Sequence, residues 1–141
     1  ERQPLYLVPQ ALCVGIGCRK GASREQIDAL FEKVMEQNCI WHEAIEMVCS
    51  IDLKKEEPGL LDFCAEHFWK LKTYDAETLR NLKGVFTASA FVKQVTGVDN
   101  VCERSAKKGS GNGEIRIPKT AQNGVTIAVA MKTVEISFKS R

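Results

Sequence analysis

Hydrophobic positions along the chain switch between the period of a strand and that of a helix, which predicts alternating strands and helices. The apolar run Leu12–Ile16 predicts a first strand. A helix is expected next, because Ser23 and Gln26 have the spacing of a capping box. The apolar positions that follow recur at i, i+3, i+4, i+7 and i+8, and they are Ile27, Leu30, Phe31, Val34 and Met35.

The middle of the chain repeats this order. Alternating apolar residues predict a second strand over Ile45–Ile51, and Pro58 suits the first turn of a second helix. The core face expected for that helix is Leu61, Cys64, Ala65 and Phe68. A short strand over Leu71–Tyr74, a helix capped by Asp75 and ending at Leu82, and helical pieces over Ser89–Val95 and Asn100–Lys107 complete this part.

The C-terminal part reads as a hairpin. Segments Glu114–Lys119 and Val125–Lys132 have strand character, and Asn123-Gly124 favours a tight turn between them. Residues 133–141 are expected to add an edge strand, since Val134, Ile136 and Phe138 alternate with polar residues. The whole predicts one α/β domain over residues 1–141, with residues 1–10 as a linker or leading segment, a parallel βαβ start and an antiparallel hairpin at the end.

The candidate chemistry lies in two loops that this topology brings to one sheet edge. If the first two strands are parallel neighbours, the loops that leave them share the edge where open α/β sheets bind ligands. The first loop carries Arg19 and Lys20 before a helix N-terminus, and the second is Asp52-Leu53-Lys54. This indicates a site for phosphate or carboxylate. The alternative is a tight strand-to-helix turn whose cations are only solvated. For Asp52 two roles are weighed evenly: a general base or substrate acceptor, and a helix cap or an ion-pair partner of Lys54 or Lys55.

The glycines of the first loop do not form a nucleotide fingerprint. Their spacing, Gly15-x-Gly17-x-x-x-Gly21, is one residue too long for a dinucleotide turn, and charged Arg19 and Lys20 stand where backbone would press on pyrophosphate. The chain contains neither G-x-x-x-x-G-K-[ST] nor G-x-S-x-G. A nucleotide site and a serine-hydrolase triad are therefore not expected.

Charge and cysteine content narrow the class of protein further. A net charge of +2 over 141 residues does not favour nucleic-acid binding, and apolar runs stay short of the about 18 residues of a membrane span. None of the six cysteines forms a C-x-x-C pair, which favours a reduced, cytoplasmic compartment. The first residue is not Met, so we expect a processed or excised segment of a longer protein.

Two further expectations concern cysteine chemistry. Cys18 stands beside two cations and a helix N-terminus, so its pKa is expected to fall. The pairs Cys39-Ile-Trp-His42 and Cys64-Ala-Glu-His67 have Cys2His2 spacing, but their context within and at the ends of helices argues against zinc. No metal site is predicted.

Three blocks of sequence together carry a family resemblance. GIGCRKGAS, SIDLKKEEPGL and IPKTAQNGVTIAVA occur in this order, and they resemble the C-terminal domain of the CbiG/CobE family of cobalamin biosynthesis over Leu12–Met131. The resemblance implies a three-layer α/β/α domain with a mixed sheet. It also implies a cobalt-precorrin-5A hydrolase, which opens the ring-A lactone of a tetrapyrrole and releases acetaldehyde, or a non-catalytic carrier or chaperone like free-standing CobE.

The resemblance also implies roles for the loop residues. The anions would be the carboxylates of a cobalt-precorrin or related corrinoid intermediate, cobalt would arrive with this substrate, and the chain would hold no cofactor of its own. Asp52 would activate water, and the substrate-binding residues would be Gly17, Cys18, Arg19, Lys20, Gly21, Ser23 and Lys54. Partners would be other cobalamin-pathway enzymes or N-terminal domains, without nucleic acid or membrane. An unrelated small anion-binding enzyme is the third alternative.

Overall fold

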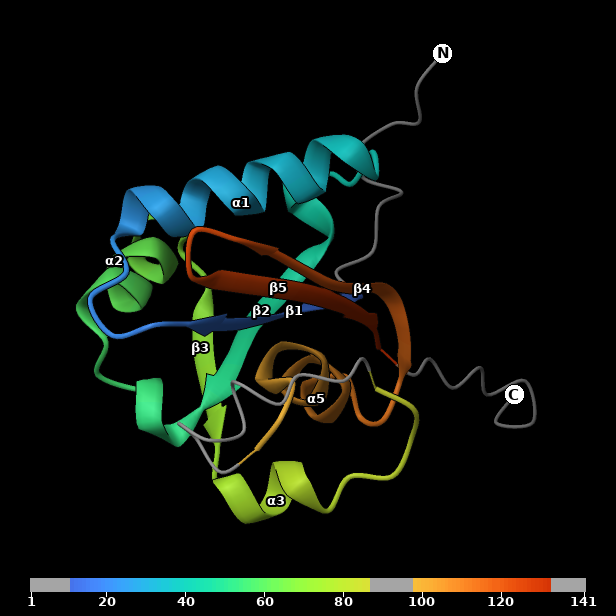
Figure 1. The fold of residues 1–141 in the computed structure, drawn as a ribbon. Coiled ribbons are helices and arrows are strands. Elements are labelled where there is room, and N and C mark those ends of the chain that lie inside the picture. Colours follow the sequence, from blue (N-terminus) through green and yellow to red (C-terminus); the bar gives the residue numbers. More distant parts are fainter. Residues whose placement is uncertain (1–10, 87–97, 133–141) are drawn as a thin grey trace.

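A five-stranded mixed sheet forms the centre of the computed structural model, which describes residues 11–86 and 98–132 (Figure 1). The strand order is β3-β2-β1-β5-β4, with β1, β2 and β3 parallel and β5 antiparallel to both of its neighbours. The strands are β1 (Leu12–Cys18), β2 (Ile45–Ile51), β3 (Lys70–Tyr74), β4 (Glu114–Gln122) and β5 (Val125–Met131). The predicted α/β class, with a parallel start and a C-terminal hairpin, is confirmed.

Helices cover both faces of this sheet and complete three layers (Figure 1). Helices α1 (Arg24–Gln37) and α2 (Pro58–His67) pack together on one face, and α5 (Val101–Gly109) packs on the other against β1, β2 and β5. The short helix α3 (Ala76–Arg80) follows β3 and contacts α5. None of the described helices is long and apolar enough to cross a bilayer.

Local signals placed the first helix correctly. Ser23 is the N-cap of α1, and the Ser23 and Gln26 side chains form the reciprocal bonds of a capping box. All five predicted apolar positions of this helix are buried in the main core. Asp75 likewise caps α3 through the Thr78 N–H, although that helix ends at Arg80 rather than Leu82.

The boundaries of several elements differ by a few residues from those predicted. β1 continues past Ile16 to Cys18, because β5 pairs with it along its whole length. β4 extends past Lys119 to Gln122, and positive φ angles at Asn123 and Gly124 make the predicted tight turn. The helix expected from Asn100 begins at Val101 with Asn100 as its N-cap. The segments 1–10, Ser89–Val95 and 133–141 lie outside the described residues.

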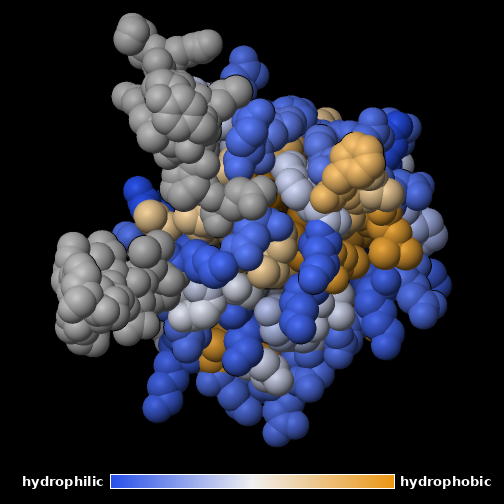
Figure 2. All heavy atoms as spheres, turned by 180° about the vertical axis from the view of Figure 1, so that it is seen from behind, coloured by the Kyte–Doolittle hydropathy of each residue, from blue (hydrophilic) through white to orange (hydrophobic). Residues whose placement is uncertain are grey.

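The predicted core face of α2 is correct at Cys64 and wrong at its other three positions. The structure buries Leu60, Phe63 and Cys64, whereas Leu61, Ala65 and Phe68 are exposed, Phe68 to 93%. Phe68 ends the helix in the left-handed conformation, which carries its side chain away from the predicted face. Hydrophobic atoms consequently gather on the side of the molecule that carries α2 (Figure 2).

Candidate functional site

The loops that follow β1 and β2 meet at one edge of the sheet, as the parallel pairing requires. The loop after β1 runs from Arg19 to Ser23, and β2 continues through a short 3₁₀ turn, Asp52–Lys54, into α2. Gly59 in the first turn of α2 lies so close to the first loop that a methyl group there would be 2.1 Å from the Ala22 carbonyl oxygen. The two loops predicted to share an edge are therefore in contact.

A carboxylate of the chain itself occupies the position where the first loop offers a backbone amide. The Gly21 N–H donates to Oε2 of Glu57 at 2.8 Å. The other oxygen, Oε1, lies 3.9 Å from Nζ of Lys54, and both side chains are largely buried, with exposed fractions of 11% and 9%. The edge thus binds a carboxylate by one amide and one cation. Glu57 gave no local sequence signal, since its partner Gly21 is 36 residues away.

Cys18 does not have the lowered pKa expected of it. Burial raises the pKa of Cys18 to about 11. The charge of Lys54 lowers this pKa and the charge of Glu57 raises it, and both effects are smaller than that of burial. The prediction of a lowered pKa is wrong because Cys18 ends β1 and packs against the core instead of lying in the cationic loop. Its thiol is protonated at neutral pH.

Arg19 and Lys20 are both exposed in the loop after β1. The Arg19 N–H donates to the Gly124 carbonyl at 2.9 Å, and its Nη1 lies 3.5 Å from the Asn123 carbonyl. Arg19 therefore lies against the β4–β5 turn, and this turn becomes a third component of the edge. Arg19, Lys20 and the buried Lys54 are three cations near one carboxylate-bearing loop.

The remaining predicted residues have structural contacts of their own. The Ser23 N–H and hydroxyl are both used by the capping box with Gln26. Gly17 lies within β1, opposite Thr126 of β5. Asp52 is half-buried at the start of the 3₁₀ turn, and its backbone carbonyl accepts the Lys55 N–H at 3.1 Å. The structure places Asp52 at the predicted edge.

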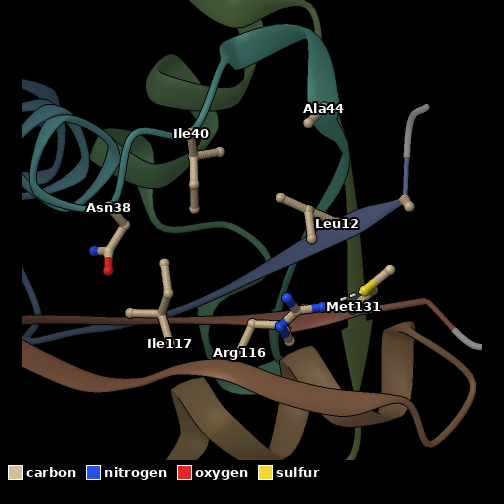
Figure 3. A pocket seen from close by; sticks show the side chains of 8 residues that line it. Leu12, Asn38, Ile40, Ala44, Arg116, Ile117 and Met131 are labelled. Atoms are coloured by element: carbon tan, nitrogen blue, oxygen red, sulfur yellow. Dashed lines mark hydrogen bonds between the residues drawn. The ribbon is translucent and has the colours of Figure 1, made fainter. Parts of the chain in front are cut away.

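Two shallow hollows lie at opposite edges of the sheet. One, of about 400 Å³, runs beside the site from Gly21 to Glu57 and Asp62. The other, of about 370 Å³, lies where β1 begins and β5 ends, between Leu12, Asn38, Arg116 and Met131 (Figure 3). The hollow beside the site contains two of the predicted substrate-binding residues, Gly21 and Ser23, and the other hollow contains none. The loop edge is therefore the better candidate for function.

The chain is similar in sequence to proteins of cobalamin biosynthesis. Residues 12–130 match the family model described as cobalamin synthesis G C-terminus. The cobalt-precorrin-5A hydrolase of Priestia megaterium is 30% identical over 87% of this chain and 33% of its own length. That of Salmonella typhimurium is 32% identical over 89% and 35%. The chain thus spans about a third of these relatives.

The fold is also shared with a solved structure from the same pathway. The crystal structure of CobE, a protein from the cobalamin biosynthetic pathway, superposes with a TM-score of 0.79 at 25% identity, covering 88% of this chain and 95% of that one. The family match covers most of the residues described above, including both loops and the C-terminal hairpin. The chain therefore belongs to the cobalamin synthesis G C-terminus family.

Proposed function

We propose that this chain binds a polycarboxylate tetrapyrrole of cobalamin biosynthesis at the loop edge, as the C-terminal domain of a cobalt-precorrin-5A hydrolase-like protein. The observation that carries the proposal is the bond between the Gly21 amide and the Glu57 carboxylate, with Lys54 beside it. It supports the proposal because a carboxylate of the chain itself is bound at this edge by an amide and a nearby cation. The acetate and propionate groups of a corrinoid precursor are ligands of the same chemistry.

The surrounding cations support this assignment. Arg19 and Lys20 are exposed at the same loop, and they would pair with further carboxylates of the substrate. Because Glu57 already covers the Gly21 amide, a substrate carboxylate would displace it or bind to the cations beside it. Cobalt would enter with the tetrapyrrole as part of the substrate.

The proposed reaction is opening of the ring-A lactone and release of a two-carbon fragment as acetaldehyde. Lactone hydrolysis needs a base that takes a proton from water and donors that stabilise the oxyanion formed at the carbonyl. We assign the first role to Asp52, at the end of β2, and the second to the Gly17–Gly21 loop with Lys20. Full activity of an Asp52→Asn variant of the complete enzyme would exclude this role for Asp52.

A carrier or chaperone without catalysis is the second candidate. It is favoured by one observation: the superposition covers 95% of CobE, whereas the sequence match covers only about a third of each hydrolase. Both candidates require tetrapyrrole binding at the loop edge. They differ in whether the complete protein that contains this domain catalyses the hydrolysis.

Titration with cobalt-precorrin-5A or a cobyrinic-acid analogue, followed by the visible bands of the corrinoid, tests both candidates. We expect a spectral shift that is weakened in an Arg19→Ala/Lys20→Ala variant. The matched control is Lys70→Ala/Lys83→Ala, which removes two exposed charges at the start of β3 and after α3. Acetaldehyde measured with the complete protein that contains this domain distinguishes hydrolase from carrier. Unchanged spectra would exclude tetrapyrrole binding at the loop edge and leave a site for a different anion.

A further inference from the structure

The two histidines of the chain, which are 25 positions apart, meet on the outer surface of the α1–α2 layer. Their ring centroids are 5.5 Å apart. His67 ends α2 and its Nε2 lies 3.0 Å from Oδ1 of Asp28, while His42 Nε2 lies 3.0 Å from Oε1 of Glu32. Asp28 and Glu32 are one turn apart on α1, so one helix presents one carboxylate to each ring.

The ligand atoms of three of these side chains are close enough for one ion. One oxygen each of Asp28 and Glu32 and a ring nitrogen of His67 all lie within 4.8 Å of one another. Zinc bonds of 2.0–2.2 Å in a tetrahedral site place ligand atoms roughly 3.4 Å apart. The His67–Asp28 separation of 3.0 Å is already near this value, so small side-chain rotations would close the site.

The surrounding residues hold the His67 ring in place. His67 stacks on Trp69 with centroids 4.6 Å apart and an interplanar angle of 12°, and its ring also contacts Phe63 and Phe31. Only 15% of its side chain is exposed. An orientation fixed by packing reduces the entropy that a ligand loses when it coordinates an ion.

Arg24 is the cation nearest to this group, and its contacts leave the ligand atoms available. Its Nη1 lies 3.2 Å from Oδ2 of Asp28 and 2.7 Å from Oε1 of Glu66. It therefore engages the oxygen of Asp28 opposite to the one that faces His67. Arg24 would act as an outer partner that orients a coordinating carboxylate.

We propose that Asp28, Glu32 and His67 form a binding site for a divalent transition metal. His42, whose Nε2 lies 3.0 Å from Oε1 of Glu32, would be the fourth ligand. One or two imidazoles with two carboxylates suit Zn²⁺, Co²⁺ or Ni²⁺ better than Mg²⁺ or Ca²⁺, which prefer oxygen ligands alone. This ligand set differs from the Cys2His2 spacing in the sequence, because Cys64 is buried in the main core. None of the three ligands lines the hollow at the loop edge, so the proposal stands independently of the proposed function.

The test is calorimetric titration of chelator-treated protein with ZnCl2, and with CoCl2 followed by its visible absorption. Because Cys39 is an exposed thiol close in sequence to His42, the reference protein is Cys39→Ser. We expect one equivalent to bind and to raise Tm. Asp28→Asn and His67→Gln should each weaken binding by more than the roughly 10–100-fold typical of outer-shell changes, and Glu36→Gln, an exposed carboxylate of the same helix, should have no effect.

Three results would overturn the proposal. The first is binding to the unsubstituted protein that is lost in Cys39→Ser, which would assign the ion to cysteine. The second is an affinity of Asp28→Asn and His67→Gln equal to that of Cys39→Ser, and the third is absence of saturable binding in both the unsubstituted protein and Cys39→Ser. Circular dichroism of each variant shows whether it is folded. If His67→Gln does not fold, Asp28→Asn and a His42→Gln variant decide the question, because neither residue is fully buried.

Discussion

A methyl group on Gly15 would lie 1.8 Å from the backbone carbonyl oxygen of Cys102, so α5 packs on β1 at a distance that only glycine allows. Because the obstacle is backbone, it cannot rotate away. We expect Gly15→Ala to lower the free energy of unfolding by about 3 kcal/mol or more, the upper end of the range for overpacking. Urea denaturation measures this loss.

Gly17 provides the matched comparison. A methyl group there would meet Oγ1 of Thr126 at 2.7 Å, and this is a side-chain atom that can move. Gly17→Ala should therefore cost about 1 kcal/mol, less than Gly15→Ala. Equal losses for the two variants would contradict a packing role for Gly15.

Glu57 should have opposite effects on stability and on ligand binding. Glu57→Gln removes the charge from the bond to Gly21 and from the neighbour of buried Lys54, so we expect the free energy of unfolding to fall by about 1–2 kcal/mol. The same change removes a competing anion, so the affinity for a corrinoid polycarboxylate should rise. Urea denaturation and spectral titration measure the two effects.

Glu56→Gln is the control for this variant, since Glu56 is the exposed neighbour of Glu57. It changes net charge equally and should alter stability by less than about 0.5 kcal/mol. If Glu56→Gln increased corrinoid affinity as much as Glu57→Gln does, net charge rather than a local competitor would be responsible.

Leu60 and Leu61 are neighbours in sequence with opposite environments. Leu60 is fully buried in the main core, while Leu61 is 41% exposed. Leu60→Ala should cost about 2–5 kcal/mol, because it leaves a cavity, and Leu61→Ala should cost much less. Thermal or urea unfolding of the two variants checks the orientation of α2, and the reverse order of the losses would restore the face predicted from sequence.

Stability should decline in alkaline solution through the buried thiols. Burial raises the pKa of Cys18 to about 11 and those of Cys64 and Cys102 to about 12, from an ordinary value of 9.0. Above pH 9 the unfolded chain loses these protons while the folded chain keeps them. The free energy of unfolding is therefore highest below pH 9 and falls as pH rises towards 11–12.

Urea midpoints measured with reductant between pH 8 and pH 11 check this trend. Cys64→Ala should flatten it by the share of one thiol, and Cys39→Ala is the matched control, because it removes an exposed thiol. Burial also raises the pKa of Tyr74 to about 12, so Tyr74 adds to the slope in both variants. A stability that rose from pH 9 to pH 11 would contradict protonated thiols in the folded protein.

Local sequence signals were sufficient for the elements that carry their own caps. Ser23 with Gln26, Asp75 with Thr78, and the Asn123-Gly124 turn each satisfy backbone groups within a few residues, so their geometry is readable from short segments. The parallel pairing of β1 and β2 followed from the helix between them. These features were enough to predict which loops share an edge.

Long-range contacts could not be predicted in the same way. Both faces of α2 carry apolar residues, and only packing against α1 and the sheet selects Leu60 and Phe63 over Leu61. The bond of Glu57 to Gly21 and the approach of His42 to His67 join segments whose relative position depends on the whole core. The burial of Cys18, which reverses its expected pKa, depends on the same packing.

The position of β5 beside β1 has a consequence for how the chain folds. β1 is the central strand, yet one of its two partners arrives more than a hundred residues later, as the Gly17–Thr126 pair shows. During synthesis, β1, β2 and β3 can assemble early, but the other side of β1 remains an open hydrogen-bonding edge until β5 emerges. We expect the closing of this edge to be the slow step of folding, and chains that stop before Val125 to aggregate through it.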